Sequence, residues 1–262
     1  MTPKTLIRRI GKTRGHFDRK ENRAAKLIEM WPDLERKFVS MIERGGGTTE
    51  TARCAYATLL MMETGIRIGN ESSAEGFVCD NRRVAGKDYP EKGIKKGDVI
   101  WQHPMHGKVV QTYGLTTLLH SHVSKKGKRL DISFVGKKIV EQSLCVKHPV
   151  LIKFCPRGAR DDLFLGINYN TLKKFIKRYV GRKFMPKDIR TAKVNLLFVS
   201  KFTDMPHSVQ FGEATTKTAR RKALSNAIEE VACEIGHTKS VCRSAYLSKP
   251  MIDWLHNYEK EK

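Results

Sequence analysis

Residues 235–246 read Ile-Gly-His-Thr-Lys-Ser-Val-Cys-Arg-Ser-Ala-Tyr, and they follow a stretch with helical character from about Thr216 to Glu234. Gly236 is predicted to end that helix and turn the chain, because glycine is common directly after helices. His237 then lies in the following loop. Tyr246 comes nine residues later, beside small residues that leave its ring room. The segment therefore presents an imidazole and a phenol within a short distance along the chain.

Two upstream segments each contribute an arginine. Arg67 lies between two glycines in Thr-Gly-Ile-Arg-Ile-Gly-Asn-Glu (64–71), directly after a predicted helix over Ala52–Glu63. Arg190 lies in Lys-Asp-Ile-Arg-Thr (187–191), and is expected in the first turn of a helix over Asp188–Phe202, where backbone N–H groups also favour an anion. Because an arginine stays protonated and grips phosphate with two hydrogen bonds, such a pair can hold phosphate charge in place of a metal ion.

In their order along the chain, these segments resemble the type IB DNA topoisomerases, particularly the compact poxvirus-like and bacterial members, and more distantly the tyrosine recombinases. The matching segments are T-G-I-R-I-G-N-E at 64–71, Y-G-L-T-T-L-L at 113–119, S-F-V-G-K-K at 133–138, K-D-I-R-T at 187–191, and G-H-T-K-S with S-A-Y between 236 and 246. The resemblance implies a type IB topoisomerase that cuts and reseals one strand of duplex DNA, with no metal ion, no ATP and no other cofactor.

The resemblance also implies a role for each matched residue. Tyr246 matches the nucleophile that forms a 3′-phosphotyrosyl link. Arg67, Arg190 and His237 match the residues that hold the non-bridging phosphate oxygens. Lys137 matches the hairpin lysine that protonates the departing 5′ oxygen, with the adjacent Lys138 as a rival. The residues expected to contact DNA without taking part in the chemistry are Lys138, Lys187, Lys239 and Arg243.

The charge of the chain favours the same partner. Fifty Lys and Arg against 27 Asp and Glu give a formal net charge of +23 over 262 residues. A protein this basic is expected to work beside a polyanion, and neutralised phosphates release counterions that drive binding. The expected partner is duplex DNA and the expected state is a monomer. No apolar run suits a secretory signal or a membrane span, so we expect a protein of the cytoplasm, or of a nucleoid or viral compartment, that is not secreted and has no membrane partner.

The periodicity predicts an α+β fold, mainly α-helical with a small antiparallel β-sheet, which is the catalytic fold of this superfamily by resemblance. Residues 1–46 are predicted to form a basic helical N-terminal arm and residues 47–262 the catalytic domain, with the glycines at 45–47 as the hinge. Residues 1–28 hold nine Lys or Arg and two acids, so the arm is expected to add salt-dependent affinity for DNA and little to the chemistry.

Secondary-structure expectations follow the apolar spacing. Lys20–Arg44 is helical in pattern, with Pro32 predicting two helices or a kink. Val99–Lys147, including Leu115 and Leu118, is predicted to form short antiparallel strands, after an irregular connection over 82–98. Asn170 is expected to cap a helix that runs to Tyr179. The scattered cysteines are expected to be reduced core thiols.

Two other functions compete with a topoisomerase. A tyrosine recombinase uses nearly the same residues, but Lys187 in place of the usual histidine and the Gly-Lys-Lys hairpin favour the topoisomerase. A non-catalytic basic nucleic-acid-binding protein would explain the charge, but it leaves the ordered motifs to chance.

Overall fold

A computed structural model describes most of the chain. The described residues are 2–11, 20–69, 77–78, 83–84, 87–88, 99–102, 109–136, 140–156, 162–164, 166–206, 210 and 216–256. Lys137, Lys138 and most of the connection predicted over 82–98 lie outside them. The chain divides into two compact units, one made of Met1–Lys37 with Ile176–Lys262 and the other of Phe38–Phe175. We call them unit 1 and unit 2 and describe each by itself.

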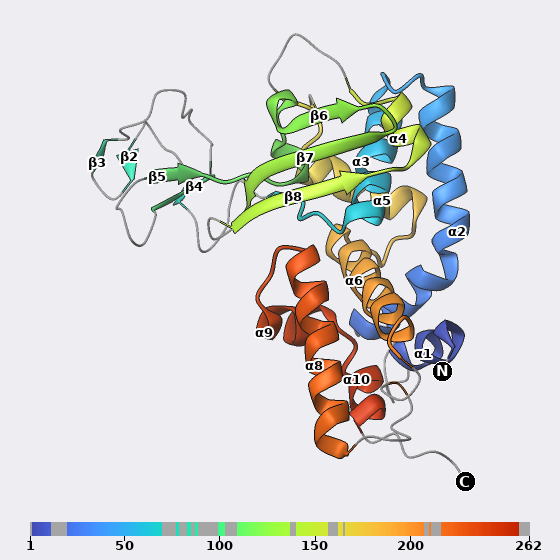
Figure 1. The fold of residues 1–262 in the computed structure, drawn as a ribbon. Coiled ribbons are helices and arrows are strands. Elements are labelled where there is room, and N and C mark those ends of the chain that lie inside the picture. Colours follow the sequence, from blue (N-terminus) through green and yellow to red (C-terminus); the bar gives the residue numbers. More distant parts are fainter. Residues whose placement is uncertain are drawn as a thin grey trace. The chain divides into compact units, whose positions relative to one another are not determined.

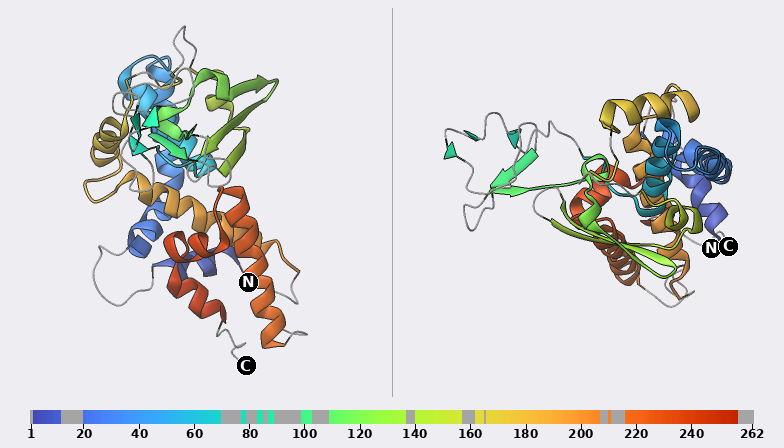
Figure 2. Two further views of the ribbon diagram at one scale, coloured as in Figure 1. Left: turned by 90° about the vertical axis from the view of Figure 1, so that its left-hand side faces the viewer. Right: turned by 90° about the horizontal axis from the view of Figure 1, so that it is seen from above.

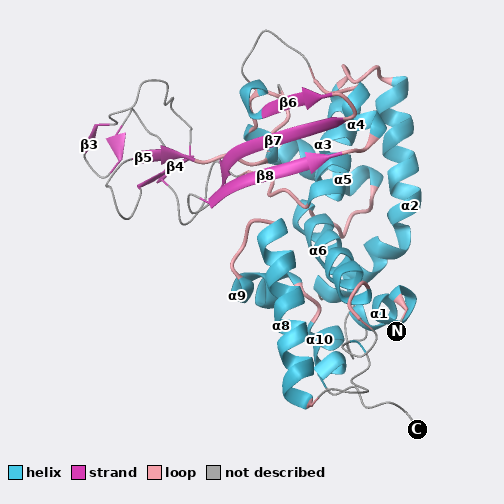
Figure 3. Cartoon of the chain, viewed as in Figure 1, coloured by secondary structure: helices cyan, strands magenta, loops and turns pink. Residues whose placement is uncertain are grey.

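Unit 1 is built from helices in its described part (Figure 3). Its elements are α1 (Pro3–Ile10), the first part of α2 (Lys20–Arg44), the end of α5 (Tyr169–Tyr179), α6 (Pro186–Thr203), α8 (Lys217–Glu234), α9 (Lys239–Val241), a π-helical turn (Cys242–Tyr246) and α10 (Lys249–His256). Helix α6 packs against α8, and α1 packs against both α6 and α10 (Figure 1). Leu6 and Ile10 of α1 are fully buried, so this short helix is part of the unit's core.

Unit 2 combines helices with the strands of the fold. Its helices are α3 (Glu50–Thr64), α4 (Pro149–Lys153), the last part of α2 and the first part of α5, with two 3-10 turns at Leu115–Thr117 and His120–His122. Its strands are β1 (Phe77–Val78), β2 (Arg83–Val84), β3 (Lys87–Asp88), β4 (Val99–Gln102), β5 (Val109–Gln111), β6 (Val123–Lys126), β7 (Arg129–Gly136) and β8 (Val140–Val146). All the described pairings are antiparallel, in the orders β1-β4-β5, β2-β3 and β6-β7-β8.

One face of the β6-β7-β8 sheet is part of the core of unit 2. Leu130, Ile132 and Phe134 alternate along β7 and are all buried, which is the pattern of a strand with one face on a core. Helix α3 contacts β8 (Figure 2). Its residues from Cys54 to Met62 are all buried. Thr49 caps its start by accepting from the N–H of Ala52. The helix ends at Gly65, whose φ of 66° is the left-handed conformation that suits glycine.

The fold class predicted from the sequence is confirmed: the chain is mainly helical with small antiparallel sheets. The predicted helix that ends before Gly236 is also confirmed, with Thr216 as its cap. In the described part of the chain, no helix is long and apolar enough to cross a membrane.

Some local predictions were wrong. Pro32 lies inside one helix, α2, so of the two alternatives predicted there, two helices or one kinked helix, the first is wrong. The cap of α5 is Asn168, whose Oδ1 accepts from the N–H of Thr171, and not Asn170. Leu115 lies in a 3-10 turn and not in a strand, because the backbone N–H of Leu115 is taken by a carbonyl of the Arg67 segment.

The cysteines follow the prediction only in part. Cys54 and Cys242 are buried, and burial raises the pKa of each thiol to about 12, so both stay protonated. Cys145 and Cys233 are exposed, because they stand on the outer faces of β8 and α8.

Candidate active site

Tyr246 is the last residue of the π-helical turn in unit 1. The backbone N–H of Leu247 donates to the carbonyl of Cys242 at 3.1 Å, which closes a turn one residue wider than an α-helical turn. Wide turns of this kind are frequent at functional sites. Tyr246 is 5% exposed, so its ring is packed into the unit.

Arg190 lies beside this ring. Its guanidinium carbon is 5.1 Å from the ring centroid of Tyr246, a cation–π distance. Its Nη2 donates to the carbonyl of Ile235 at 3.0 Å, and the residue is 4% exposed. The sequence had suggested that Arg190 lies in the first turn of the helix. Because α6 begins at Pro186, Arg190 lies in the second turn instead. Arg190 therefore acts from the side of the helix and connects the Ile235 turn to Tyr246.

His237 completes a cluster of three predicted residues. Gly236 adopts a φ of 65°, and the N–H of His237 donates back to the carbonyl of Ala232 at 2.7 Å, so the chain leaves α8 in a defined direction. The rings of His237 and Tyr246 have centroids 5.1 Å apart. The loop position predicted for His237 is confirmed, and the structure brings His237, Arg190 and Tyr246 together.

Asn195 and Ser248 are site residues that the sequence analysis missed. The side-chain amide of Asn195 donates to the carbonyl of Tyr246 at 3.0 Å, and its oxygen accepts from the N–H of Ser248 at 2.9 Å. Both residues are buried. The available signals were a polar side chain in the apolar run Val194–Phe198, and a serine just before Lys249-Pro250, since serine is a common helix cap and proline is common in a helix's first turn.

The predicted DNA-contacting residues of unit 1 differ in their surroundings. Lys187 is exposed at the start of α6. Arg243 is exposed on the π turn, with Nη2 3.4 Å from Nε2 of His256. Lys239 donates to a carboxylate oxygen of Glu229 at 3.0 Å, so part of its charge is already balanced.

In unit 2 the Arg67 segment is joined to the second motif, residues 113–119. The carbonyl of Arg67 accepts from the N–H of Leu115, and the carbonyl of Ile68 accepts from the N–H of Thr116, both at 2.7 Å. Gly69 and Gly114 touch so closely that a Cβ on Gly114 would lie 2.3 Å from the backbone nitrogen of Gly69. The two glycine motifs are therefore two sides of one contact, which fixes the backbone at Arg67.

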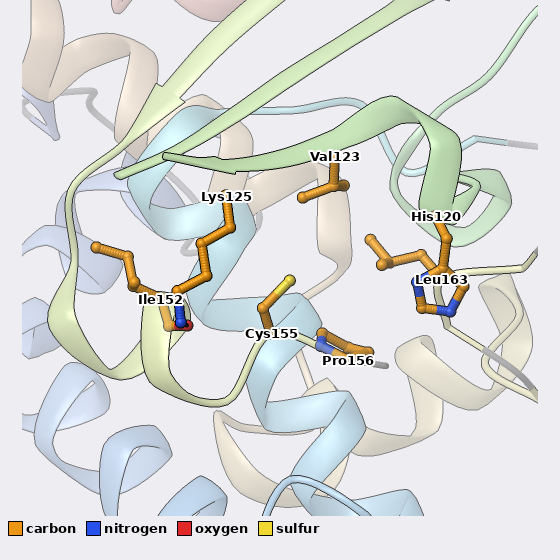
Figure 4. Close-up of a pocket in the computed structure, with 7 residues that line it drawn as sticks. All are labelled: His120, Val123, Lys125, Ile152, Cys155, Pro156 and Leu163. Atoms are coloured by element: carbon orange, nitrogen blue, oxygen red, sulfur yellow. Dashed lines mark hydrogen bonds between the residues drawn. The ribbon is translucent and has the colours of Figure 1, made fainter. Parts of the chain in front are cut away.

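A separate pocket of about 200 Å³ lies in unit 2 (Figure 4). It is lined by His120, Val123, Lys125, Ile152, Cys155, Pro156 and Leu163. The ammonium of Lys125, which lines this pocket, already donates to the carbonyl of Ile152 at 3.1 Å. None of the predicted site residues lines it. Among the described residues, no group of three or more His, Cys, Asp or Glu is placed to hold a metal ion.

Comparison with known proteins agrees with this geometry. The sequence model of the family described as "Eukaryotic DNA topoisomerase I, catalytic core" matches residues 104–261, which is more than half of the chain. That range includes Arg190, His237 and Tyr246.

Curated viral proteins are also similar to part of the chain. DNA topoisomerase 1 of Rabbit fibroma virus (strain Kasza) is 25% identical over 150 residues, which are 55% of this chain and 45% of that protein. DNA topoisomerase 1B of Vaccinia virus (strain Copenhagen) is 26% identical over 149 residues, with the same coverage. DNA topoisomerase 1B of Acanthamoeba polyphaga mimivirus is 22% identical over 165 residues, 56% of this chain and 48% of that protein. The chain thus spans less than half the length of these relatives, and the match to the family's own model over more than half of the chain shows that it belongs to the eukaryotic DNA topoisomerase I catalytic-core family.

Proposed function

We propose that this protein is a type IB DNA topoisomerase that relaxes supercoiled duplex DNA through a covalent phosphotyrosyl intermediate. The observation that carries the proposal is the cluster in unit 1, where the ring of Tyr246 lies 5.1 Å from both the guanidinium of Arg190 and the ring of His237. A phenol beside a buried guanidinium and an imidazole is suited to attack a phosphodiester and to stabilise the charge that develops.

The first step is a transesterification at phosphorus. The phenolic oxygen of Tyr246 forms a bond to the scissile phosphorus and loses its proton to water. The bond from phosphorus to the 5′ oxygen breaks, and that oxygen takes a proton from the general acid proposed below. One ester bond replaces another, so the energy of the phosphodiester is conserved in the phosphotyrosine. Attack of the 5′ hydroxyl on this ester reverses the step without ATP, and rotation of the freed strand in between relaxes the DNA.

Cationic side chains would stabilise the transition state. Arg190 and His237 are proposed to donate hydrogen bonds to the non-bridging oxygens, and Arg67 is assigned the same role by its motif. Preorganised donors of this kind contribute on the order of 3 kcal/mol each to lowering a barrier. Burial strengthens such contacts, because the Arg190 guanidinium lies where water screens it little.

Lys137 is proposed as the general acid for the departing 5′ oxygen, and Lys138, Lys187, Lys239 and Arg243 as contacts to DNA phosphates. A lysine has an ordinary pKa of about 10.4, and neighbouring cations lower such a value toward the range useful for proton transfer. The remaining proposals are that the protein acts as a monomer on duplex DNA and requires no cofactor.

Relaxation of supercoiled plasmid in excess EDTA and without ATP tests the proposal. We expect fully relaxed topoisomers, and a protein–DNA adduct when the reaction is stopped with denaturant. Tight DNA binding with unchanged supercoils would refute the proposal and favour a non-catalytic binding protein. Recombinant products from a two-site substrate would favour a recombinase.

A further inference from the structure

The N-terminal segment, defined here as residues 2–11 and 20–28, holds the part of unit 1 that carries the nucleophile. We propose that it is a brace for the active site, with Arg23 and Ser248 as positioning residues for Arg190 and Tyr246. This inference rests on the proposed function, and it assigns to the segment a role beyond the charge that its sequence suggests.

The first contact lies just after the nucleophile. The hydroxyl of Ser248 donates to the carbonyl of Ile10 at 2.8 Å, and both residues are essentially inaccessible to solvent. Ile10 ends α1, and the last carbonyls of a helix have no partner within it. Ser248 supplies that partner. Ser248 also lies two residues after Tyr246 and is tied to it through Asn195, so the end of α1 is linked to the backbone of Tyr246.

The second contact lies just before the nucleophile. The ammonium of Lys20, in the first turn of α2, donates to the carbonyl of Ser244 at 2.8 Å. Ser244 lies inside the π-helical turn, where hydrogen bonds span five residues and the backbone is wider than in an α-helix. Tyr246 is therefore held on both sides, two residues before and two residues after, by groups of the N-terminal segment.

The third contact acts on Arg190. The Nε of Arg23 donates to Oδ1 of Asp188 at 3.0 Å, while Oδ2 of Asp188 accepts from the N–H of Met185 at 2.9 Å. Asp188 is 4% exposed, and a buried carboxylate without a cation is costly. Since Asp188 stands two residues before Arg190 in α6, Arg23 stabilises the turn that leads directly to the catalytic guanidinium.

Apolar packing supports the same interpretation. Leu6 and Ile10 are fully buried, and the guanidinium of Arg9 lies 4.6 Å from the ring of Trp254 in α10. The segment is therefore held to unit 1 by apolar contacts as well as by its charges. A segment built into the core cannot act only as a mobile source of positive charge.

A matched pair of substitutions distinguishes a brace from a segment that contributes only positive charge for DNA binding. Arg23→Gln and Lys26→Gln each remove one positive charge from α2, but Lys26 pairs with Glu29 at the surface and not with Asp188. The measurement is the single-turnover rate of adduct formation on a nicked suicide duplex with saturating protein, together with DNA affinity and thermal unfolding.

We expect Arg23→Gln to slow adduct formation about tenfold or more, because small displacements of reacting groups are costly to rates. Lys26→Gln should stay within about twofold, as is usual for surface substitutions. The DNA affinity of the two variants should be equal, and Arg23→Lys should restore part of the rate. Equal rates for Arg23→Gln and Lys26→Gln would overturn the brace.

Ser248→Ala provides a second variant in case Arg23→Gln does not fold. Its control is Ser200→Ala, since the hydroxyl of Ser200 lies on the exposed side of α6 and donates to Asp204, away from Tyr246. Ser248→Ala should slow adduct formation with affinity unchanged, and Ser200→Ala should not. Loss of affinity in step with rate would overturn the positioning role.

Amide hydrogen exchange distinguishes failure of the brace from failure of the proposed function. If the unsubstituted protein forms no adduct, the topoisomerase proposal fails. The brace still predicts faster exchange over residues 242–248 in Ser248→Ala and Arg23→Gln than in their controls. Unchanged exchange in these residues would overturn it whatever the activity.

Discussion

At the scale of single residues, Tyr246 is held by contacts that do not involve its phenolic oxygen. Asn195 holds its backbone carbonyl, and Arg190 and His237 lie beside its ring. A phenyl ring in the same place keeps these contacts. The oxygen is therefore the one group whose removal should affect the chemistry alone.

Tyr246→Phe is expected to abolish adduct formation and relaxation while DNA affinity stays within about threefold, because phosphate contacts dominate affinity. The measurement is adduct formation on a nicked suicide substrate, with affinity measured in parallel. Any adduct formed by the Phe variant would place the nucleophile elsewhere, with Tyr179 and Tyr258 as the phenols to test next.

Lys137→Ala tests the general acid. It should slow cleavage of an ordinary phosphodiester strongly but hardly affect a 5′-bridging phosphorothiolate, since a thiolate leaves without a proton. Single-turnover rates on both substrates provide the measurement. Equal slowing on the two would remove Lys137 from the role and direct the same experiment to Lys138.

At the scale of elements, the contact between Gly69 and Gly114 fixes the turn that carries Arg67. Gly114 has an extended backbone that any residue can adopt, so its requirement is for space and not for conformation. Gly127, at the β6–β7 turn, is the opposite case, with φ of 57° and nothing within 4 Å of an added Cβ.

Gly114→Ala is expected to lower the free energy of unfolding by about 3 kcal/mol, as overpacking against backbone does, and to slow cleavage by moving Arg67. Gly127→Ala should cost about 1 kcal/mol from its conformation alone and leave cleavage unchanged. Urea unfolding and single-turnover cleavage measure both. A Gly114→Ala protein with normal stability and normal cleavage would show that the two motifs separate easily.

The elements that were predicted best from the sequence are helices whose first and last residues are typical helix-capping residues. Helix α3 lies between Thr49 and Gly65, and α8 lies between Thr216 and Gly236. These threonine caps and left-handed glycines could be recognised from the sequence alone. Pro32 does not divide α2, because packing of the apolar stripe of this helix keeps it continuous despite one missing hydrogen bond.

The residues of the site that belong to a sequence motif could be predicted, and those that depend on tertiary contacts could not. Arg190, His237 and Tyr246 were predicted from the resemblance of their motifs to a known family, and the structure brings them together. Asn195 and Ser248 act through hydrogen bonds to backbone atoms distant in sequence, and such partners leave no local pattern. The same holds for the ion pair between Arg23 and Asp188, whose members are 165 residues apart.

At the scale of the whole molecule, the net charge of +23 should make the proposed binding to DNA sensitive to salt. Not every cation contributes equally, because a lysine already paired with a carboxylate releases fewer counterions from DNA. Lys187 is exposed, whereas Lys239 is paired with Glu229.

Lys187→Gln is expected to reduce the slope of log affinity against log salt by about 0.9, the value of one phosphate contact. Lys239→Gln should reduce it by clearly less. Binding to a short duplex at several salt concentrations gives both slopes. Equal reductions would mean that Lys239 leaves Glu229 when DNA binds.

The wide turn at Cys242–Tyr246 also limits how this region can change in length. Each residue advances a helix by about 100°, and the hydrogen bond from Leu247 to Cys242 already contains one residue more than an α-helical turn needs. A deletion in this turn would let the backbone relax to an ordinary helix and would rotate the phenol away from Arg190. Insertions and deletions in the lineage of this protein should therefore collect in surface turns such as the one at Gly127, and the interval from His237 to Tyr246 should stay constant in length even where its residues vary.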